Sequence, residues 1–265
     1  MARLYSRARR KVTGERYVQL VVCGYPRSGT SLLYNMLSTS LIGFRFEPFE
    51  LSAIYRMHRL GSIASKFPLD VFNVPRLPEM NPHDKRLCVV GVVRDPRDLI
   101  TSRHPMLPDR YFIGYEHSWW PQDEAFERWK YDGPGIVDVF EALQALGKQT
   151  EIPFHEVRYE DLVTDPNAVQ DQLANRFSFD FSSRFSDFHL WQGKLAYRYS
   201  GRTRAKDESL VREDRPADVS RAGKWMQPEH RDRLREQFES CPKLFEILRT
   251  YGYEPDDDWF DAYGR

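Results

Sequence analysis

Apolar runs alternate with segments of helical periodicity along most of the chain. Residues 17–23 and 86–93 form the strongest apolar runs and predict buried strands. Further strands are predicted over 152–159 and, more briefly, over 43–46. The run 86–93 (RLCVVGVV) is apolar almost throughout, which is typical of a parallel strand covered on both faces. The pattern therefore predicts a mainly parallel sheet.

Helices are predicted between and after these strands. Pro48 and the pair Asp95–Pro96 mark helix starts, because proline suits the first turn and aspartate accepts hydrogen bonds from free N–H groups there. Gly252 marks the end of the last predicted helix. The predicted helices cover residues 30–38, 48–58, 96–103, 136–148, 166–177, 228–239 and 242–251.

The alternation predicts an α/β fold with a doubly wound sheet flanked by helices. The chain shows no internal repeat and no linker that would divide it. Residues 17–265 are therefore expected to form one domain after a basic tail, 1–16. Residues 105–135 are rich in aromatic residues and poor in pattern, and residues 197–221 are predicted to be a long polar loop.

Composition restricts the partners. Of the 265 residues, 41% are hydrophobic and 29% are charged, which is typical of a globular protein, and the net charge is zero. A neutral chain gives no general case for binding nucleic acid, so any anion site must be a local cluster. No run reaches the ~18 apolar residues of a membrane span. The oligomeric state is left open.

Cysteine and histidine usage indicates the compartment. The chain has three cysteines, too few for a disulfide framework, and Cys23 and Cys88 lie inside apolar runs as expected core residues. The basic N-terminus lacks the apolar core of a secretory signal. A cytoplasmic location is therefore predicted. No C-x-x-C pair or histidine cluster indicates a metal site.

The most informative stretch is 21–33 (VVCGYPRSGTSLL), where a strand passes through a glycine-bounded loop into a helix. Gly24 and Gly29 have the spacing of the phosphate-binding motif G-x-x-x-x-G-K-[ST], whose lysine contacts the phosphates of a nucleoside triphosphate. Here Thr30 occupies the lysine position, and Arg27 supplies the cation. Backbone N–H groups and the helix N-terminus favour an anion. We therefore expect an anion with less charge than a triphosphate.

A second candidate site follows the strand 86–93. Arg94 stands at the carboxyl end of this strand, where ligands bind in open α/β sheets. Ser102 lies about two helical turns further on, so both residues reach one anion only if the helix folds back across the site. Asp95 is interpreted as the helix cap. A solvated helix face is predicted for Arg97, Asp98 and Arg103.

Three motifs in order, 24-GYPRSGTSLL-33, 93-VRDPRDLITS-102 and 158-RYEDLVTDP-166, resemble those of the sulfotransferase family, and the likeness extends from about residue 19 to 253. These enzymes take the sulfuryl group from 3′-phosphoadenosine 5′-phosphosulfate (PAPS) and leave adenosine 3′,5′-bisphosphate (PAP). The resemblance implies a P-loop fold of this type. It also implies transfer to an acceptor hydroxyl without a metal ion, by in-line displacement.

The resemblance also assigns roles to residues. The 5′-phosphosulfate would be bound by Arg27, Ser28, Gly29, Thr30 and Ser31, and the 3′-phosphate by Arg94 and Ser102. Tyr159 would lie near the adenosine. The stretch 220-SRAGKWM-226 resembles a closing loop that returns a basic residue to the 3′-phosphate, with Lys224 as first choice and Ser220 and Arg221 as further candidates.

Arg27 has a second implied role, because its charge can stabilise the departing 5′-phosphate. Arginine at this position resembles the carbohydrate and tyrosine-protein branches of the family, whereas the soluble small-molecule branch has lysine. A soluble bacterial or phage relative would fit this arginine in a chain without an anchor. A saccharide is one candidate acceptor, and the sequence does not identify it further.

An acceptor hydroxyl must lose its proton as it attacks sulfur, so a base is expected. Glu47 is the first candidate, because it stands where the arginine-type branches place a glutamate. Glu50 is the second candidate and His104 the third. Trp119, Trp120 and Trp129 either face an acceptor or pack a lid onto the core.

Two other functions remain open at this point. A P-loop kinase would need a cation on the γ-phosphate and an acid for magnesium, but Thr30 occupies the lysine position and Arg94 precedes Asp95. A non-catalytic nucleotide-binding module would keep the loop without the chemistry. Binding of PAP in the absence of magnesium, and the activity of a Glu47 variant, separate these alternatives.

Overall fold

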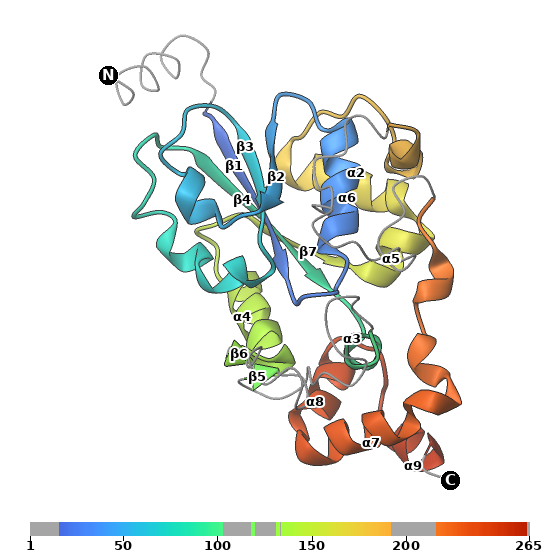
Figure 1. Cartoon of the computed structure of the whole chain (residues 1–265). Coiled ribbons are helices and arrows are strands. Elements are labelled where there is room, and N and C mark those ends of the chain that lie inside the picture. The colour runs from blue at the N-terminus through green and yellow to red at the C-terminus, as the bar shows by residue number, and fades with distance from the viewer. Residues whose placement is uncertain (1–15, 103–117, 120–130, 133, 192–215, 264–265) are drawn as a thin grey trace.

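The computed structural model describes residues 16–102, 118–119, 131–132, 134–191 and 216–263. Its centre is a five-stranded, wholly parallel sheet with the order β2-β3-β1-β4-β7 (Figure 1). The strands are β1 (Val18–Gly24), β2 (Arg45–Glu50), β3 (Ile63–Lys66), β4 (Arg86–Val93) and β7 (Phe154–Arg158). A separate antiparallel pair is formed by β5 (Ser118–Trp119) and β6 (Tyr131–Asp132). The predicted α/β fold is confirmed.

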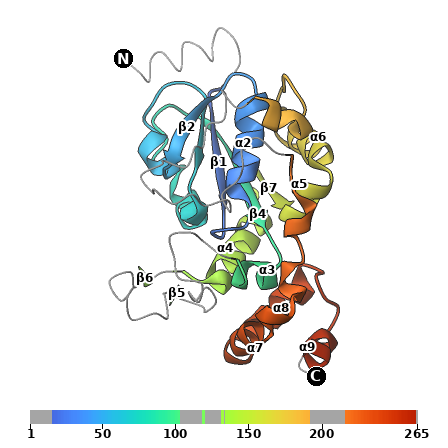
Figure 2. The same ribbon diagram turned by 45° about the vertical axis from the view of Figure 1, so that its right-hand side comes forward.

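Two layers of helices cover the sheet, as the doubly wound pattern requires (Figures 1 and 2). Alternate residues of β1 enter different cores: Leu20 and Val22 join one cluster, and Val21 and Cys23 the other. The first cluster includes α2 (Thr30–Ser40), α5 (Tyr159–Thr164) and α6 (Pro166–Phe177), and the second includes α4 (Ile136–Lys148), α7 (Arg231–Ser240) and α8 (Lys243–Thr250).

The order of the strands creates a topological switch point at β1. β1 pairs with β3 on one side and β4 on the other, so the chain first forms the β2–β3 side of the sheet and then crosses to the β4–β7 side. In open α/β sheets ligands bind at such a switch point, beyond the carboxyl ends of the strands. Helices α7, α8 and α9 (Asp258–Tyr263) lie beyond this end of the sheet, beside α3 (Pro96–Ile100) (Figures 1 and 2).

The segment after α2 differs from the prediction. The strand continues to Glu50, and a short 3-10 helix, η1 (Ala53–Arg56), replaces the helix predicted from Pro48 to residue 58. Pro48 is compatible with this strand because β2 lies at the edge of the sheet and its pairing with β3 is irregular between Phe46 and Glu50. Strand β3 was not predicted, because its four residues are too short to show a period. Helices α5 and α9 were also missed.

Other elements coincide with the predictions. The bounds of β4, α4 and α6 are those read from the sequence. Asp95 caps α3 by accepting a hydrogen bond from the Arg97 N–H at 2.8 Å, but α3 ends at Ile100 rather than at residue 103. Cys23 and Cys88 are buried, as expected of core residues; Cys241 is buried as well, and all three are free. Among the described residues, none of the helices has the length and apolar character needed to span a bilayer.

Candidate functional site

The loop between β1 and α2 has an unusual backbone. Gly24, Arg27 and Gly29 all have positive φ, at 148°, 73° and 102°. A Cβ at Gly29 would lie 2.5 Å from Cδ2 of Tyr159, and one at Gly24 would lie 2.3 Å from the carbonyl oxygen of Val92. Glycine is therefore required at both positions, by conformation and by space. The loop is held between β4 and the ring of Tyr159.

The polar groups of this loop lie at the start of α2. Thr30 is the first residue of the helix, whose N-terminal N–H groups have no partners within the helix itself. Ser28 is fully buried, and its Oγ has no hydrogen-bond partner among the described residues. A buried hydroxyl without a partner is costly unless a ligand or water satisfies it. The arrangement is suited to bind an anion.

Arg27, Arg94 and Ser102 come together at this loop. Arg27 Nε donates to Ser102 Oγ at 3.1 Å, and Arg94 Nη1 donates to the Arg27 carbonyl oxygen at 3.3 Å. Because α3 is short, Ser102 reaches the loop without a long helix folding back. The Arg94 guanidinium lies over the Tyr159 ring, 4.3 Å from its centroid. Tyr159 is thus placed beneath Arg94 and against Gly29.

The prediction of a solvated face for α3 was wrong. Arg97 and Asp98 are only 3% and 2% exposed, because the C-terminal part of the chain packs over α3. Arg97 forms ion pairs with Asp95 and Glu254. Burial raises the pKa of the Asp95 carboxyl, and the Arg97 guanidinium only partly offsets this. Arg103 lies outside the described residues.

The stretch 220–226 lies against this site through its backbone. Arg94 Nη2 donates to the carbonyl oxygen of Arg221 at 2.5 Å. The side chain of Ser220 instead contacts Asp218, and Lys224 is exposed on the 3-10 helix η8 (Lys224–Met226). Of the closing-loop residues, Arg221 is the one whose contact with Arg94 is seen among the described residues.

Lys66 is a site residue that the sequence reading missed. It ends β3, is 0% exposed, and donates from Nζ to Ser31 Oγ at 2.8 Å and to Glu50 Oε1 at 2.6 Å. Burial lowers the pKa of its ammonium, and Glu50 restores it only in part. The available signal was a lysine that closes the short run 63-IASK-66. Through these two hydrogen bonds, Lys66 links Glu50, the second candidate base, to Ser31 at the start of α2.

Glu47, the first candidate base, is 7% exposed and held by arginines. Arg56 Nη2 donates to its Oε2 at 2.9 Å, and Arg45 Nη2 lies 3.5 Å from its Oε1. Burial alone would raise the pKa of the Glu47 carboxyl, but Arg56, Arg45 and Arg59 together bring it below the usual value. The Tyr34 hydroxyl accepts a hydrogen bond from the Glu47 N–H at 2.9 Å, which fixes this part of β2.

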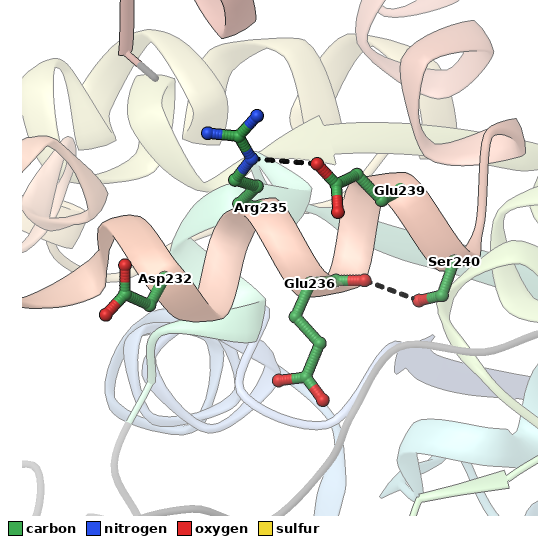
Figure 3. Close-up of a pocket in the computed structure, with 5 residues that line it drawn as sticks. All are labelled: Asp232, Arg235, Glu236, Glu239 and Ser240. Atoms are coloured by element: carbon green, nitrogen blue, oxygen red, sulfur yellow. Dashed lines mark hydrogen bonds and ion pairs between the residues drawn. The ribbon is translucent and has the colours of Figure 1, made fainter. Parts of the chain in front are cut away.

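The remaining candidate residues of the sequence reading fall between positions 103 and 133. His104, Trp120 and Trp129 lie outside the described residues, and Trp119 lies on β5. A surface hollow of about 470 Å³ lies on the outer face of α7 (Figure 3). Its lining is largely acidic and does not suit an anion. The lining residues are Asp232, Arg235, Glu236, Glu239 and Ser240. In the part of the chain that the structure describes, no three His, Cys, Asp or Glu residues are grouped to hold a metal ion.

Comparisons with known proteins agree on one family. The family model described as "Sulfotransferase domain" matches residues 18–177. Carbohydrate sulfotransferase 4 of Mus musculus is 24% identical over 179 residues, which cover 64% of this chain and 42% of the mouse protein. The chain thus matches less than half the length of that relative.

A solved structure supports the same fold. The mouse sulfotransferase SULT7A1, complexed with PAP, superposes with a TM-score of 0.54 and 16% sequence identity, and the match covers 89% of this chain and 90% of that one. At this identity the likeness concerns the fold. The stretch 220–226 lies outside the residues matched by the family model, so its place in the site rests on its contacts with Arg94 and α3.

Proposed function

The chain belongs to the sulfotransferase family, and from this premise we propose that it transfers a sulfuryl group from PAPS to an acceptor hydroxyl. The observation that carries the proposal is the convergence of Arg27, Arg94 and Ser102 at the carboxyl ends of β1 and β4. The loop between β1 and α2, helix α3 and residues 220–226 (the closing stretch) come from distant parts of the chain. Their cationic and N–H groups meet at one place, as a doubly phosphorylated nucleotide would require.

The residues present fit this nucleotide. Ser28 Oγ and Arg94 Nε are both buried and without a partner among the described residues, so each has hydrogen-bonding capacity for an anion. We propose that the 5′-phosphosulfate is held by Arg27, Ser28, Gly29, Thr30 and Ser31. We assign the 3′-phosphate to Arg94, Ser102 and the stretch that contains Ser220, Arg221 and Lys224. Tyr159 supports Arg94 from below and is proposed to border the adenosine.

PAPS supplies an activated sulfuryl group bonded through oxygen to its 5′-phosphate. The chain's own residues must neutralise charge on both sides of that bond. Arg27 provides the fixed charge on the phosphate side. Lys66, held by Ser31 and Glu50, adds a second positive charge beside the same loop. A positively charged lysine here would favour sulfuryl oxygens as charge develops on them.

The acceptor hydroxyl must give its proton to a base. Glu47 is the proposed base, with Glu50 as the alternative. Each has its own support: the resemblance of the sequence to the arginine-type branches implies Glu47, whereas Glu50 contacts Lys66 next to the loop. The acceptor is proposed to be a small molecule or a carbohydrate. The cytoplasmic location stays a prediction.

Calorimetric titration with PAP tests the proposal. Purified protein is titrated in EDTA and then in magnesium, with ATP as the competing ligand. Tight binding of PAP in EDTA is expected, because the proposed ligands are arginine, hydroxyl and N–H groups. Binding of ATP that depends on magnesium, with no binding of PAP, would instead support the kinase alternative.

The choice of base is tested with Glu47→Gln and Glu50→Gln, using labelled PAPS and a panel of hydroxyl acceptors. Loss of the base should lower turnover about 100-fold or more while the affinity for PAP survives. The variant that shows this loss identifies the base. Transfer that is undetectable in the unmodified protein, with PAP still bound, would support a non-catalytic module.

A further inference from the structure

The Asp98 carboxylate is an unexpected group to find in a site for anions. It is 2% exposed and accepts two hydrogen bonds from the backbone of the closing stretch. The Gly223 N–H donates to Oδ2 at 2.8 Å, and the Trp225 N–H donates to Oδ1 at 3.2 Å. These contacts join positions 125 and 127 residues apart in the sequence. Both carboxylate oxygens are therefore used to hold this stretch.

The same carboxylate also contacts Arg94. Asp98 Oδ2 lies 3.3 Å from Arg94 Nη2, and this Nη2 also donates to the Arg221 carbonyl oxygen. Arg94 is thus held by Asp98 on one side and stacked on Tyr159 on the other. Its Nε has no partner among the described residues and stays available. Asp98 is the group that fixes Arg94 and the closing stretch relative to each other.

Arg97 provides a second attachment for the same stretch. Its guanidinium lies 3.7 Å from the centroid of the Trp225 ring and 4.7 Å from that of Trp259. A buried arginine stacked on two indole rings and paired with Asp95 has little freedom to move. The closing stretch is therefore attached to α3 by both its backbone and a side chain.

We propose that Asp98 is a positioning residue that makes the site selective for nucleotides with a 3′-phosphate. This inference rests on the proposed function, because it assumes that Arg94 binds that phosphate. Asp98 does not touch the nucleotide. It holds Gly223 and Trp225 so that Arg94 and the closing stretch face the same phosphate, and the 5′ end of the nucleotide is left to the loop after β1.

The charge of the Asp98 carboxylate and its positioning of Arg94 should change the affinity for PAP in opposite directions, which makes the proposal testable. If only charge mattered, removing a negative group beside an anion site would tighten the binding of PAP. If Asp98 acts by positioning, Asp98→Asn weakens the binding of PAP, because an amide cannot accept both N–H groups and hold Arg94. Adenosine 5′-monophosphate (AMP) lacks the 3′-phosphate and should not be affected.

Dissociation constants for PAP and AMP are measured by calorimetry on the unmodified protein, Asp98→Asn and Glu229→Gln. Glu229 is exposed on the 3-10 helix after the closing stretch, so its variant controls for the loss of one negative charge. Asp98→Asn should raise the Kd for PAP about 10- to 100-fold, the value of hydrogen bonds to charged groups. The Kd for AMP should change less than about 3-fold on the same scale, and Glu229→Gln should leave both unchanged.

An unchanged or tighter Kd for PAP in Asp98→Asn overturns the proposal, as does an equal loss for both nucleotides. Asp98→Glu repeats the test if the asparagine variant does not fold, because it keeps the charge but moves the carboxylate by one methylene. An unmodified protein that binds PAP no better than AMP would refute the 3′-phosphate site itself. Failure of the inference alone is distinct: the unmodified protein prefers PAP, and both variants keep that preference.

Discussion

Two parts of the candidate site are built in different ways. The nucleotide end, comprising Arg27, Arg94, Ser102, Tyr159 and the stretch 220–226, is held by contacts from four separate parts of the chain. The β2 edge, comprising β2, η1 and Lys66, is more open. Phe49 and Tyr55 are 62% and 61% exposed there, whereas Glu47 on the same edge is buried.

This difference fits a site that binds one constant donor at one end and a less strictly defined acceptor at the other. In the proposed function every turnover uses the same sulfuryl donor, so the nucleotide end can be rigid, and preorganised groups lose little freedom on binding. The β2 edge lies at the border of the sheet, with aromatic surface left for another molecule to cover. Substitutions should therefore act on PAP affinity at one end, and on turnover or acceptor affinity at the other.

The largest effect is expected at the nucleotide end, from Gly29→Ala. The new Cβ would lie 2.5 Å from the Tyr159 ring on a residue with φ of 102°, so both the loop and the ring must move. The affinity for PAP should fall about 100-fold or more, because several charge-assisted hydrogen bonds are displaced together.

Gly61→Ala is the matched control for Gly29→Ala. Gly61 has φ of 97°, but nothing lies within 4 Å of a Cβ built there. This variant should lose about 1 kcal/mol of unfolding free energy through backbone strain alone and keep its affinity for PAP. Equal loss of PAP affinity in both variants would show that the contact with Tyr159 is unimportant.

Lys66→Met tests the β2 edge. We expect kcat to fall about 10- to 100-fold, because the variant lacks a positive charge beside the loop where the sulfuryl group is proposed to lie. PAP has no sulfuryl group, so its Kd should change less than about 3-fold on the same scale. Lys85→Met is the control: Lys85 is also buried but contacts Gln19 and the Arg56 carbonyl oxygen instead. A weaker affinity for PAP in Lys66→Met would move this lysine to the nucleotide end.

The lowered pKa of Lys85 predicts that the stability of the protein depends on pH. Burial, with Arg45 nearby, lowers the pKa of its ammonium to about 8 from an ordinary value of 10.5. Between these values the unfolded chain holds a proton that the folded chain lacks, so the unfolding free energy should rise with pH. Urea unfolding from pH 7.5 to 10 should show this rise reduced in Lys85→Met. Parallel curves for the two proteins would contradict the assignment.

The smallest effect is expected from Phe49→Ser. Because the side chain is exposed, the unfolding free energy should change by less than about 0.5 kcal/mol, and PAP affinity should be unchanged. The KM for an accepted hydroxyl compound should rise a few-fold, because one partly covered aromatic contact contributes about that much to binding. Leu190→Ser, 69% exposed at the end of the 3-10 helix Phe185–Leu190, is the control and should leave this KM unchanged. An unchanged KM in Phe49→Ser would remove Phe49 from the acceptor surface.

The nucleotide end was largely predictable from the sequence, for a physical reason. Residues that follow parallel strands meet at one edge of a sheet, so Gly24 to Ser31 and Arg94 had to lie together once β1 and β4 were recognised. The glycines were informative because only glycine satisfies the backbone found there. Whether Glu47 is the base, and which closing-loop residue binds the 3′-phosphate, stay predictions.

Two features could not be read from the sequence. Lys66 ends a strand of four residues, and its partners Glu50 and Ser31 lie on other elements. Asp98 stands among polar residues of α3, a pattern typical of a solvated face, yet it is covered by a stretch more than a hundred residues later. Local periodicity reports the burial of regular elements, but not what an irregular segment covers.

The packing of Arg97 on the C-terminal part of the chain has an evolutionary consequence. Glu254 and Trp259 contact Arg97, and Arg97 is paired with Asp95, the residue next to Arg94. Glu254 and Trp259 lie well outside residues 18–177, by which the family is recognised. Substitutions there would change how the proposed nucleotide site is held while every recognised motif stayed intact. If the proposed function holds, the C-terminal part of the chain gives selection a way to adjust donor affinity that is separate from the motifs and from the choice of acceptor.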